Sequence, residues 1–404
     1  MTNYIIMKKT ALLLLCGALF LGACQKIEQH QTPPKDNDLT GVKVNVDNFA
    51  DKAQKVFVLN EGSMGSNDAT LDFLRLPYGI YISDAFKKMN PSVGAGLGDV
   101  GNDIAVIGDE VWIVVNNSGI VEVISAEDEI EIKAISVPTP RYIAFDKDYA
   151  YVTSWAGAYA IYEGWDLVDS FNTKGKVYKI NLNTKQIEGT VEVGYQPEGI
   201  ACYGGKLYVA NSGGLMLAPT YNYDNTVSII DAASFTVAKT VEVQVNLKNV
   251  YSDGAGNIYV TTLGDYWMNH SGLYMLQASN PDNPAHVADY VSVSAINGDT
   301  VYCIGTDTEF DFSGIDHTYK AWTAKKGVKS DLSLSLSHAT PYSIGVLDEN
   351  TIFVGELSVY TYEDEGVEKW ATDYYNPGAV TCYWHGNKLW SVQAGVMPGH
   401  FAIY

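Results

Sequence analysis

The sequence has little positive charge and no long hydrophobic run. It contains only two arginines, and its 26 basic residues face 47 acidic residues, for a net charge of −21. Such a chain offers no basic surface for nucleic acid or for anionic lipid. It also lacks a stretch of about 20 apolar residues that could span a bilayer. With 47% hydrophobic residues, however, it has enough apolar material for a core, so disorder of the whole chain is excluded.

Cysteine and histidine are scarce and scattered. Beyond the first 24 residues, Cys202, Cys303 and Cys382 lie in apolar strand contexts without CxxC spacing, and we interpret them as buried thiols. The seven histidines show no HxH or HxxxH spacing, so no metal ligand is assigned. GxSxG, P-loop and GxGxxG motifs are absent. The sequence therefore predicts no catalytic residues and no resident cofactor, and we expect a binding protein rather than an enzyme.

The N-terminus resembles a bacterial lipoprotein signal peptide. Two lysines and an apolar run precede the tetrapeptide Leu21–Cys24, in which small residues come before a cysteine. On this interpretation, residues 1–23 are the signal and Cys24 carries the lipid. The polar segment 24–54 is then a flexible tether. The alternative is an ordinary secretory signal with a chance cysteine.

The remainder of the chain, 55–404, is a repeat. A short pattern of an apolar residue, an aromatic residue and Val, Ile or Cys recurs seven times and predicts half-buried strands. Its aromatic positions are Phe57, Trp112, Tyr151, Tyr208, Tyr259, Tyr302 and Phe353. A second pattern, Pro-x-x-apolar-small-apolar, precedes several of these strands and begins at Pro140, Pro197 and Pro341. Small residues at its centre suit innermost strands that converge on a narrow axis. With two further strands, one repeat holds four strands in about 50 residues, as in a propeller blade.

The two ends of the repeat region complement each other. The first repeat, from Lys55 to about Met89, lacks the innermost strand, and the C-terminal segment Pro398–Tyr404 matches the missing pattern. Pairing of that last strand into the first blade would remove the open sheet edges. The sequence therefore predicts an all-β fold, a seven-bladed β-propeller closed by its C-terminal strand.

Candidate binding residues gather where loops are long and rich in aromatic residues. Connections between the second and third strands of a blade emerge on one face of a propeller, and here those of blades 3 to 7 are long. Aromatic loop residues and polar residues at the ends of the aromatic strands are therefore the predicted ligand-binding set: Trp155, Tyr159, Trp165, Tyr221, Tyr223, Tyr266, Trp267, Phe312, Asn60, Glu61, Asn116, Asn211, Thr262 and Glu356. The alternative is that the loops fold over the ring and bury their own aromatic residues.

Two segments carry a resemblance to a known family. The stretch Val56–Asn67 followed by Ala69–Asp72, and the ending Gln393–Phe401, resemble Bacteroidetes surface lipoproteins of the YVTN/YncE-like propeller class. Within that class the chain is similar to the BtuG proteins. This resemblance implies a lipid-anchored protein of the outer membrane, exposed at the cell surface. It also implies binding of cobalamin (vitamin B12) or related corrinoids, which are passed to a TonB-dependent outer-membrane transporter. Two other functions stay open: binding of a glycan or protein partner, and extracytoplasmic lyase or hydrolase activity.

Overall fold

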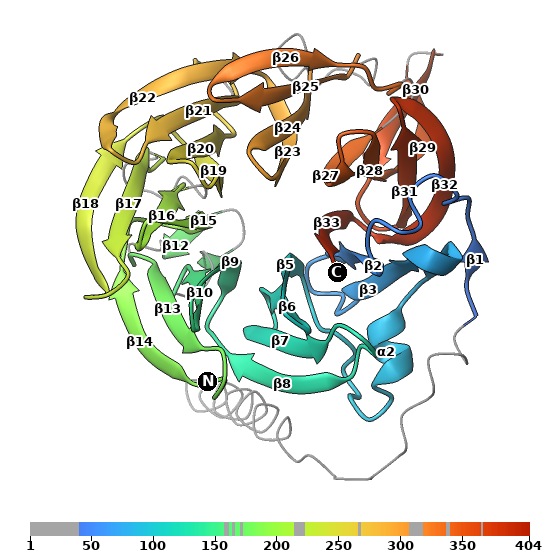
Figure 1. Ribbon diagram of the computed structural model, residues 1–404, viewed down its shortest axis with the longest axis horizontal. Coiled ribbons are helices and arrows are strands. Elements are labelled where there is room, and N and C mark those ends of the chain that lie inside the picture. The colour runs from blue at the N-terminus through green and yellow to red at the C-terminus, as the bar shows by residue number, and fades with distance from the viewer. Residues whose placement is uncertain are drawn as a thin grey trace, which may run out of the picture. The chain divides into compact units, whose positions relative to one another are not determined.

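The computed structural model describes residues 40–156, 161–163, 166–169, 173–213, 223–265, 268–306, 318–336, 340–364 and 367–404. All of them belong to one compact unit, Pro34–Tyr404. Within this unit the strands form seven main antiparallel sheets arranged around a central axis (Figure 1). The prediction of an all-β, seven-bladed propeller is confirmed.

Each blade has four strands, ordered from the axis outward. The innermost strands of blades 1 to 7 are β33 (Pro398–Ile403), β5 (Gly101–Ile107), β9 (Pro140–Asp146), β15 (Pro197–Tyr203), β19 (Leu247–Ser252), β23 (Val291–Asn297) and β27 (Pro341–Asp348). The second strands are β2 (Lys55–Asn60), β6 (Glu110–Val115), β10 (Tyr149–Ser154), β16 (Lys206–Asn211), β20 (Asn257–Thr262), β24 (Thr300–Gly305) and β28 (Thr351–Glu356). These second strands contain the seven aromatic residues of the repeat, which are almost completely buried, as predicted.

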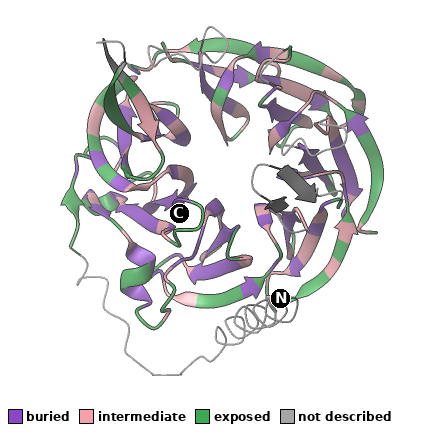
Figure 2. Ribbon diagram, turned by 180° about the vertical axis from the view of Figure 1, so that it is seen from behind, coloured by how far each residue is buried: buried purple, intermediate pink, exposed green. Residues whose placement is uncertain are grey.

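The third strands are largely buried, and most of the outermost strands are exposed. The third strands are β3 (Thr70–Arg75), β7 (Ile120–Ser125), β13 (Lys176–Asn181), β17 (Thr226–Asp231), β21 (Gly272–Gln277), β25 (Lys320–Lys325) and β31 (Pro377–Trp384). The outermost strands are β4 (Ile80–Ile82), β8 (Glu131–Ser136), β14 (Ile187–Glu192), β18 (Thr236–Glu242), β22 (Asn280–Asp289), β26 (Val328–Leu332) and β32 (Asn387–Val396). Figure 2 shows burial near the axis and exposure along most of the outer rim.

The chain ends close the ring. β33 pairs antiparallel with β2, with Phe57 opposite Ala402 and Asn60 opposite Pro398. The C-terminal strand thus becomes the innermost strand of blade 1, as predicted. Apart from the blades, the described residues form the short helix α2 (Ala85–Met89), the 3-10 turn η2 (Leu76–Tyr78) and the small sheets β11 (Ile161–Glu163) with β12 (Asp166–Asp169) and β29 (Ser358–Asp364) with β30 (Val367–Asp373).

The segment before blade 1 differs from the predicted tether. β1 (Val42–Lys43) pairs with β4 as a fifth strand of blade 1. Val44, Val46 and Phe49 are buried in the same cluster as Phe353 of blade 7. Among the described residues, the folded unit therefore already includes this segment before residue 55, because three apolar side chains in an otherwise polar stretch pack against residues of the first and last blades. Residues 1–39, with Cys24, lie outside the described part of the chain.

The three remaining cysteines are free thiols in the strands. Cys303 and Cys382 are buried, as predicted, whereas Cys202 is only half-buried. Burial raises the pKa of Cys303 to about 12, with only a small opposing effect from Lys329. This thiol is thus protonated at neutral pH and behaves as a small apolar side chain.

Candidate functional site

The seven innermost strands share an irregularity at their first residues. In every blade the pairing between the innermost and second strands shifts register there, for example between Pro197 and Ile200 and between Gly101 and Asp103. The shift leaves one residue after the strand start without a partner in blades 1, 2, 6 and 7, and two residues in blades 3, 4 and 5. Bulges of this kind at the rim of a barrel or propeller re-aim side chains. We call the end of the central axis at which the innermost strands start the channel mouth.

The second and third residues of each innermost strand are polar or charged in most blades. The pairs are Gly399-His400, Asn102-Asp103, Arg141-Tyr142, Glu198-Gly199, Lys248-Asn249, Ser292-Val293 and Tyr342-Ser343. They lie at the same edge of the blades as the carboxyl ends of the second strands, because the two strands are antiparallel: Pro140 is opposite Ser154 and Pro341 opposite Glu356. The long loops after the second strands therefore leave from the same face, as predicted.

Arg141, Glu198 and Trp155 form one interlocked unit at the mouth. The Arg141 guanidinium donates from Nη2 to Glu198 Oε2 at 2.8 Å and from Nε to both carboxylate oxygens. Trp155 Nε1 donates to the other carboxylate oxygen, Oε1, at 3.1 Å, and the guanidinium carbon lies 4.6 Å from the indole centroid. The pair is largely shielded from solvent, so its geometry is fixed. A rigid aromatic surface beside a satisfied ion pair results.

A second cluster forms around His400 of blade 1. His400 Nε2 is 3.3 Å from Glu61 Oε1, and the Tyr342 hydroxyl donates to Glu61 Oε2 at 2.7 Å. His400 Nδ1 also lies 3.9 Å from Asp103 Oδ1. Its ring packs edge-on against Tyr142, with centroids 6.3 Å apart. Residues of β5, β9 and the end of β2 therefore meet at the imidazole carried by β33, and Tyr342 of β27 joins them through Glu61.

The two carboxyl groups beside His400 have opposite pKa shifts. Burial would raise the pKa of Glu61, but the hydrogen bond and charge of His400, with the Tyr342 hydroxyl, outweigh it and lower that pKa. Burial raises the pKa of Asp103 to about 6, although His400 and two backbone N–H groups favour its carboxylate. Glu61 is therefore a fixed anion, while Asp103 titrates in the mildly acidic range.

Of the predicted site residues, Trp155 and Glu61 take part in these clusters. Four others are buried and bonded to backbone groups or strand hydroxyls: Asn116 donates to Pro140 O, Thr262 to Val245 O, and Asn60 to Thr70 Oγ1. Asn211 bonds to Thr226, Ser228 and the Gly194 N–H. Glu356 accepts from Thr381 Oγ1, and Tyr223 is half-buried. Tyr159, Trp165, Tyr221, Tyr266, Trp267 and Phe312 lie outside the described residues.

Sequence reasoning missed most of the mouth. Arg141, Glu198, His400, Asp103 and Tyr342 were not among the predicted ligand-binding residues. The signal was nevertheless present, because each occupies one of the two variable positions in the innermost-strand pattern. Aligning the seven strand starts would have shown charged or phenolic residues where a strand normally carries apolar ones.

An aromatic hairpin also stands on this face. β29 and β30 pair from Ser358 with Asp373 to Asp364 with Val367. The hairpin and the residues after it carry five exposed aromatic side chains: Tyr360, Tyr362, Trp370, Tyr374 and Tyr375. The Tyr374 carbonyl accepts a hydrogen bond from Ser63 of blade 1 at 2.7 Å, which ties the base of the hairpin to the ring.

Two features common in other proteins are absent from the described part of the chain. No group of three His, Cys, Asp or Glu side chains is arranged there to hold a metal ion. No helix among the described residues is long and apolar enough to cross a membrane.

Comparisons with known proteins establish the fold. No family model matches the chain, and no curated protein matches it. Among solved structures, a quinonprotein alcohol dehydrogenase-like protein from Bacteroides thetaiotaomicron is 12% identical, with a TM-score of 0.54 over 87% of this chain and 78% of that one. A functionally unknown protein from Desulfotomaculum acetoxidans is 14% identical, with a TM-score of 0.54 over 87% and 99%. Hydrazine synthase of Kuenenia stuttgartiensis is 13% identical, with a TM-score of 0.53 over 75% and 89%. At such identities the likeness concerns the propeller fold alone.

Proposed function

We propose that the chain binds cobalamin or a related corrinoid at the channel mouth and passes it to a TonB-dependent outer-membrane transporter. The observation that carries the proposal is the Arg141–Glu198–Trp155 unit, an indole ring held in place beside the axis by two charged side chains. Its rigidity means that little conformational entropy is lost when a ligand covers the ring. The resemblance to the BtuG proteins supplies the ligand class.

The polar groups at the mouth match the chemistry of a corrinoid. A corrin ring bears many amide arms, each of which both donates and accepts hydrogen bonds. Glu61 and Glu198 offer acceptors, whereas Arg141, Tyr342 and His400 offer donors. This alternation suits amides better than a ligand of a single charge sign. The broad corrin face can pack against Trp155.

The transfer step needs a second surface beside the ligand. The β29–β30 hairpin exposes Tyr360, Tyr362 and Trp370 on strands that project from blade 7. Tyr and Trp dominate the binding energy of many protein interfaces. We assign this hairpin to the transporter contact. In this proposal the protein is anchored through a lipid on Cys24 and faces outward from the outer membrane.

Binding is tested by mixing the purified chain with cyanocobalamin. We expect the coloured ligand to co-elute with protein in size exclusion and to titrate in calorimetry. Trp155→Ala should weaken binding about 30-fold or more, because anchoring aromatics contribute about 2 kcal/mol or more. Absence of binding at micromolar protein would contradict the proposal.

The two arginines provide a matched control. Arg141→Lys removes the forked contact with Glu198 and should weaken binding, whereas Arg75→Lys changes the same residue type at the opposite end of blade 1 and should not. Equal effects of both substitutions would show that the channel mouth is not the binding site.

A further inference from the structure

Contacts between neighbouring blades at the face opposite the channel mouth follow a rule in blades 2, 3 and 4. In these blades the turn between the third and outermost strands contains a residue with positive φ, whose side chain reaches the second strand of the preceding blade. Glu129 of blade 2 has φ of 58° and binds Lys55 of blade 1 at 2.5 Å. Lys185 of blade 3 has φ of 57° and binds Glu110 of blade 2 at 2.7 Å. We call such a side chain the plug residue.

Blade 4 follows the rule with an aromatic side chain, and blade 6 makes a related contact through its backbone. Phe235 of blade 4 has φ of 52°, and its ring lies 5.9 Å from that of Tyr151 in blade 3. In blade 6 the plug position is Lys326, and the next residue, Gly327, donates its N–H to the Tyr259 hydroxyl of blade 5 at 3.0 Å. In each case the cleft between blades is filled or bridged.

Blade 5 departs from the rule. Its turn has two residues, like that of blade 6, with Gln277 paired directly to Asn280, but none of these four residues has a positive φ. The turn still starts alike: Ala278 N–H donates to Gly256 O just as Ala232 N–H donates to Gly205 O in blade 4. The residue that would cover the second strand of blade 4 is missing. A pocket of about 440 Å³ opens there between blades 4 and 5.

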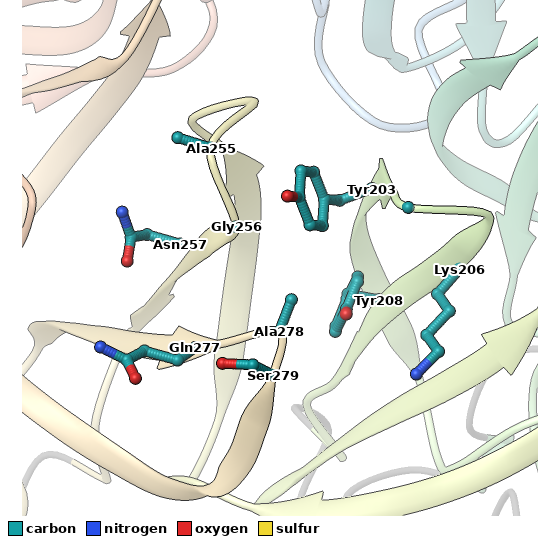
Figure 3. Close-up of a pocket in the computed structure, with 10 residues that line it drawn as sticks. Tyr203, Lys206, Tyr208, Ala255, Gly256, Asn257, Gln277, Ala278 and Ser279 are labelled. Carbon is teal, nitrogen blue, oxygen red and sulfur yellow. The ribbon is translucent and has the colours of Figure 1, made fainter.

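The walls of this pocket are polar and aromatic. Blade 4 contributes Tyr203, Lys206 and the buried Tyr208, and blade 5 contributes Asn257, Gln277 and Ser279 (Figure 3). Tyr203 lies beside Gly256, whose φ of 102° and missing Cβ let the backbone come close to the phenol ring. Asn257 donates to Asp253 at 2.5 Å, which fixes the amide and leaves its oxygen free to accept. The volume lies within the range of ligand sites, roughly 300–1,000 Å³.

The charge of Lys206 is partly compensated. Hydrogen bonds from Ser234, together with the nearby ammonium of Lys206, lower the pKa of Asp231 on the neighbouring strand. Lys206 therefore has an anion close by and does not make the pocket a strong anion site. What remains is a phenol ring flanked by amides and a hydroxyl, a combination that pairs a flat apolar surface with both donors and acceptors.

We propose that the pocket between blades 4 and 5 binds a neutral saccharide, with one pyranose unit against Tyr203 and its hydroxyls on Asn257 and Gln277. The site is distinct from the channel mouth, because its lining comes from the other ends of the same strands. The inference therefore does not depend on corrinoid binding. If both proposals hold, the propeller binds one ligand on each of its two faces.

The test is saturation-transfer NMR on the purified full chain. The probes are methyl glycosides of mannose, galactose and N-acetylglucosamine, each at about 5 mM because single sugars commonly bind near 1 mM. We expect transfer to at least one of them. Ala278→Phe supplies an aromatic plug like Phe235 and should reduce binding at least tenfold. Gln277→Ala should weaken it roughly threefold to tenfold, because one hydrogen bond is lost.

Gln186→Ala is the matched control, since Gln186 is an exposed glutamine in the corresponding turn of blade 3 and should leave binding unchanged. If Ala278→Phe fails to fold, the comparison of Gln277→Ala with Gln186→Ala decides. The proposal is overturned if no glycoside shows transfer, or if binding survives in a folded Ala278→Phe chain. It is also overturned if glucuronate binds while the neutral glycosides do not.

Discussion

Two sets of polar side chains lie at the same face of the ring and differ in role. At the ends of the second strands, Asn116 and Asn211 are buried and bonded to neighbouring backbone or strand hydroxyls. At the starts of the innermost strands, Arg141 bonds to Glu198 of the next blade, and His400 lies beside Glu61, Asp103 and Tyr142. The first set is bonded to backbone groups and strand hydroxyls, whereas the second set contacts charged and aromatic side chains, most of them from other blades. Polarity at a strand end is thus not sufficient to mark a site; the partners of the side chain decide.

The largest loss of stability is expected from removing β33, which carries His400 and completes blade 1. Deleting Pro398–Tyr404 removes His400 and leaves the edge of β2 unpaired. Buried backbone groups without partners cost about 1–3 kcal/mol each, against a typical total stability of about 5–15 kcal/mol. We expect aggregation or loss of a cooperative melting transition, measured by size exclusion and circular dichroism. A soluble variant with a cooperative melt would show that ring closure is dispensable.

A smaller loss of stability, without a loss of affinity, is expected from a substitution at the end of a second strand. Asn211→Ala removes three hydrogen bonds from a fully buried position, so the free energy of unfolding should fall by about 2–4 kcal/mol in urea titrations. Affinity for cyanocobalamin should stay within about threefold, since the Asn211 side chain bonds to Gly194, Thr226 and Ser228 and to none of the side chains at the mouth. The reverse pattern, with stability kept and binding lost, would place Asn211 in the binding site and erase the distinction drawn above.

The smallest effect concerns pH at the channel mouth. Burial raises the pKa of Asp103 to about 6, so the folded state takes up this proton more readily than the unfolded chain. Stability from this group is therefore present at low pH and lost as pH rises from about 4 through 6. Asp103→Asn removes this dependence and should gain roughly 1–3 kcal/mol over the natural chain at pH 8, but little at pH 4. Denaturant titrations at the two pH values measure the difference. An equal effect at both would contradict the assignment of the raised pKa to Asp103.

The ring, its closure and its aromatic core could be predicted because they depend on short-range pattern. Tyr208 and Tyr259 recur in the same local context, and the C-terminal segment has the strand pattern that the first repeat lacks. Periodicity of this kind is visible in the sequence without any knowledge of distant contacts. The same reasoning underestimated the segment from Val42 to Phe49, where three apolar residues are too few to produce a period.

The candidate site was harder to predict because it is built from contacts between blades. Glu198 belongs to blade 4, yet it holds Arg141 and Trp155 of blade 3. Nothing near Glu198 in the sequence indicates those partners. Asn60 and Asn211 were selected for their place at strand ends, but the side of the strand on which a polar group lies depends on register, which composition does not reveal. The plug residues have the same property, since each acts on a neighbouring blade.

The pairing of β33 with β2 also has a consequence for the order of folding. Asn60 and Pro398 are opposite each other although they lie at the two ends of the repeat region. During synthesis, blade 1 emerges before the other blades but has no inner strand until β33 has been made. Blades 2 to 7 can each form from contiguous chain, whereas the first blade is completed after all of them. The ring therefore closes only once β33 is available, and a chain that stops before β33 is left with an open sheet edge for degradation or aggregation.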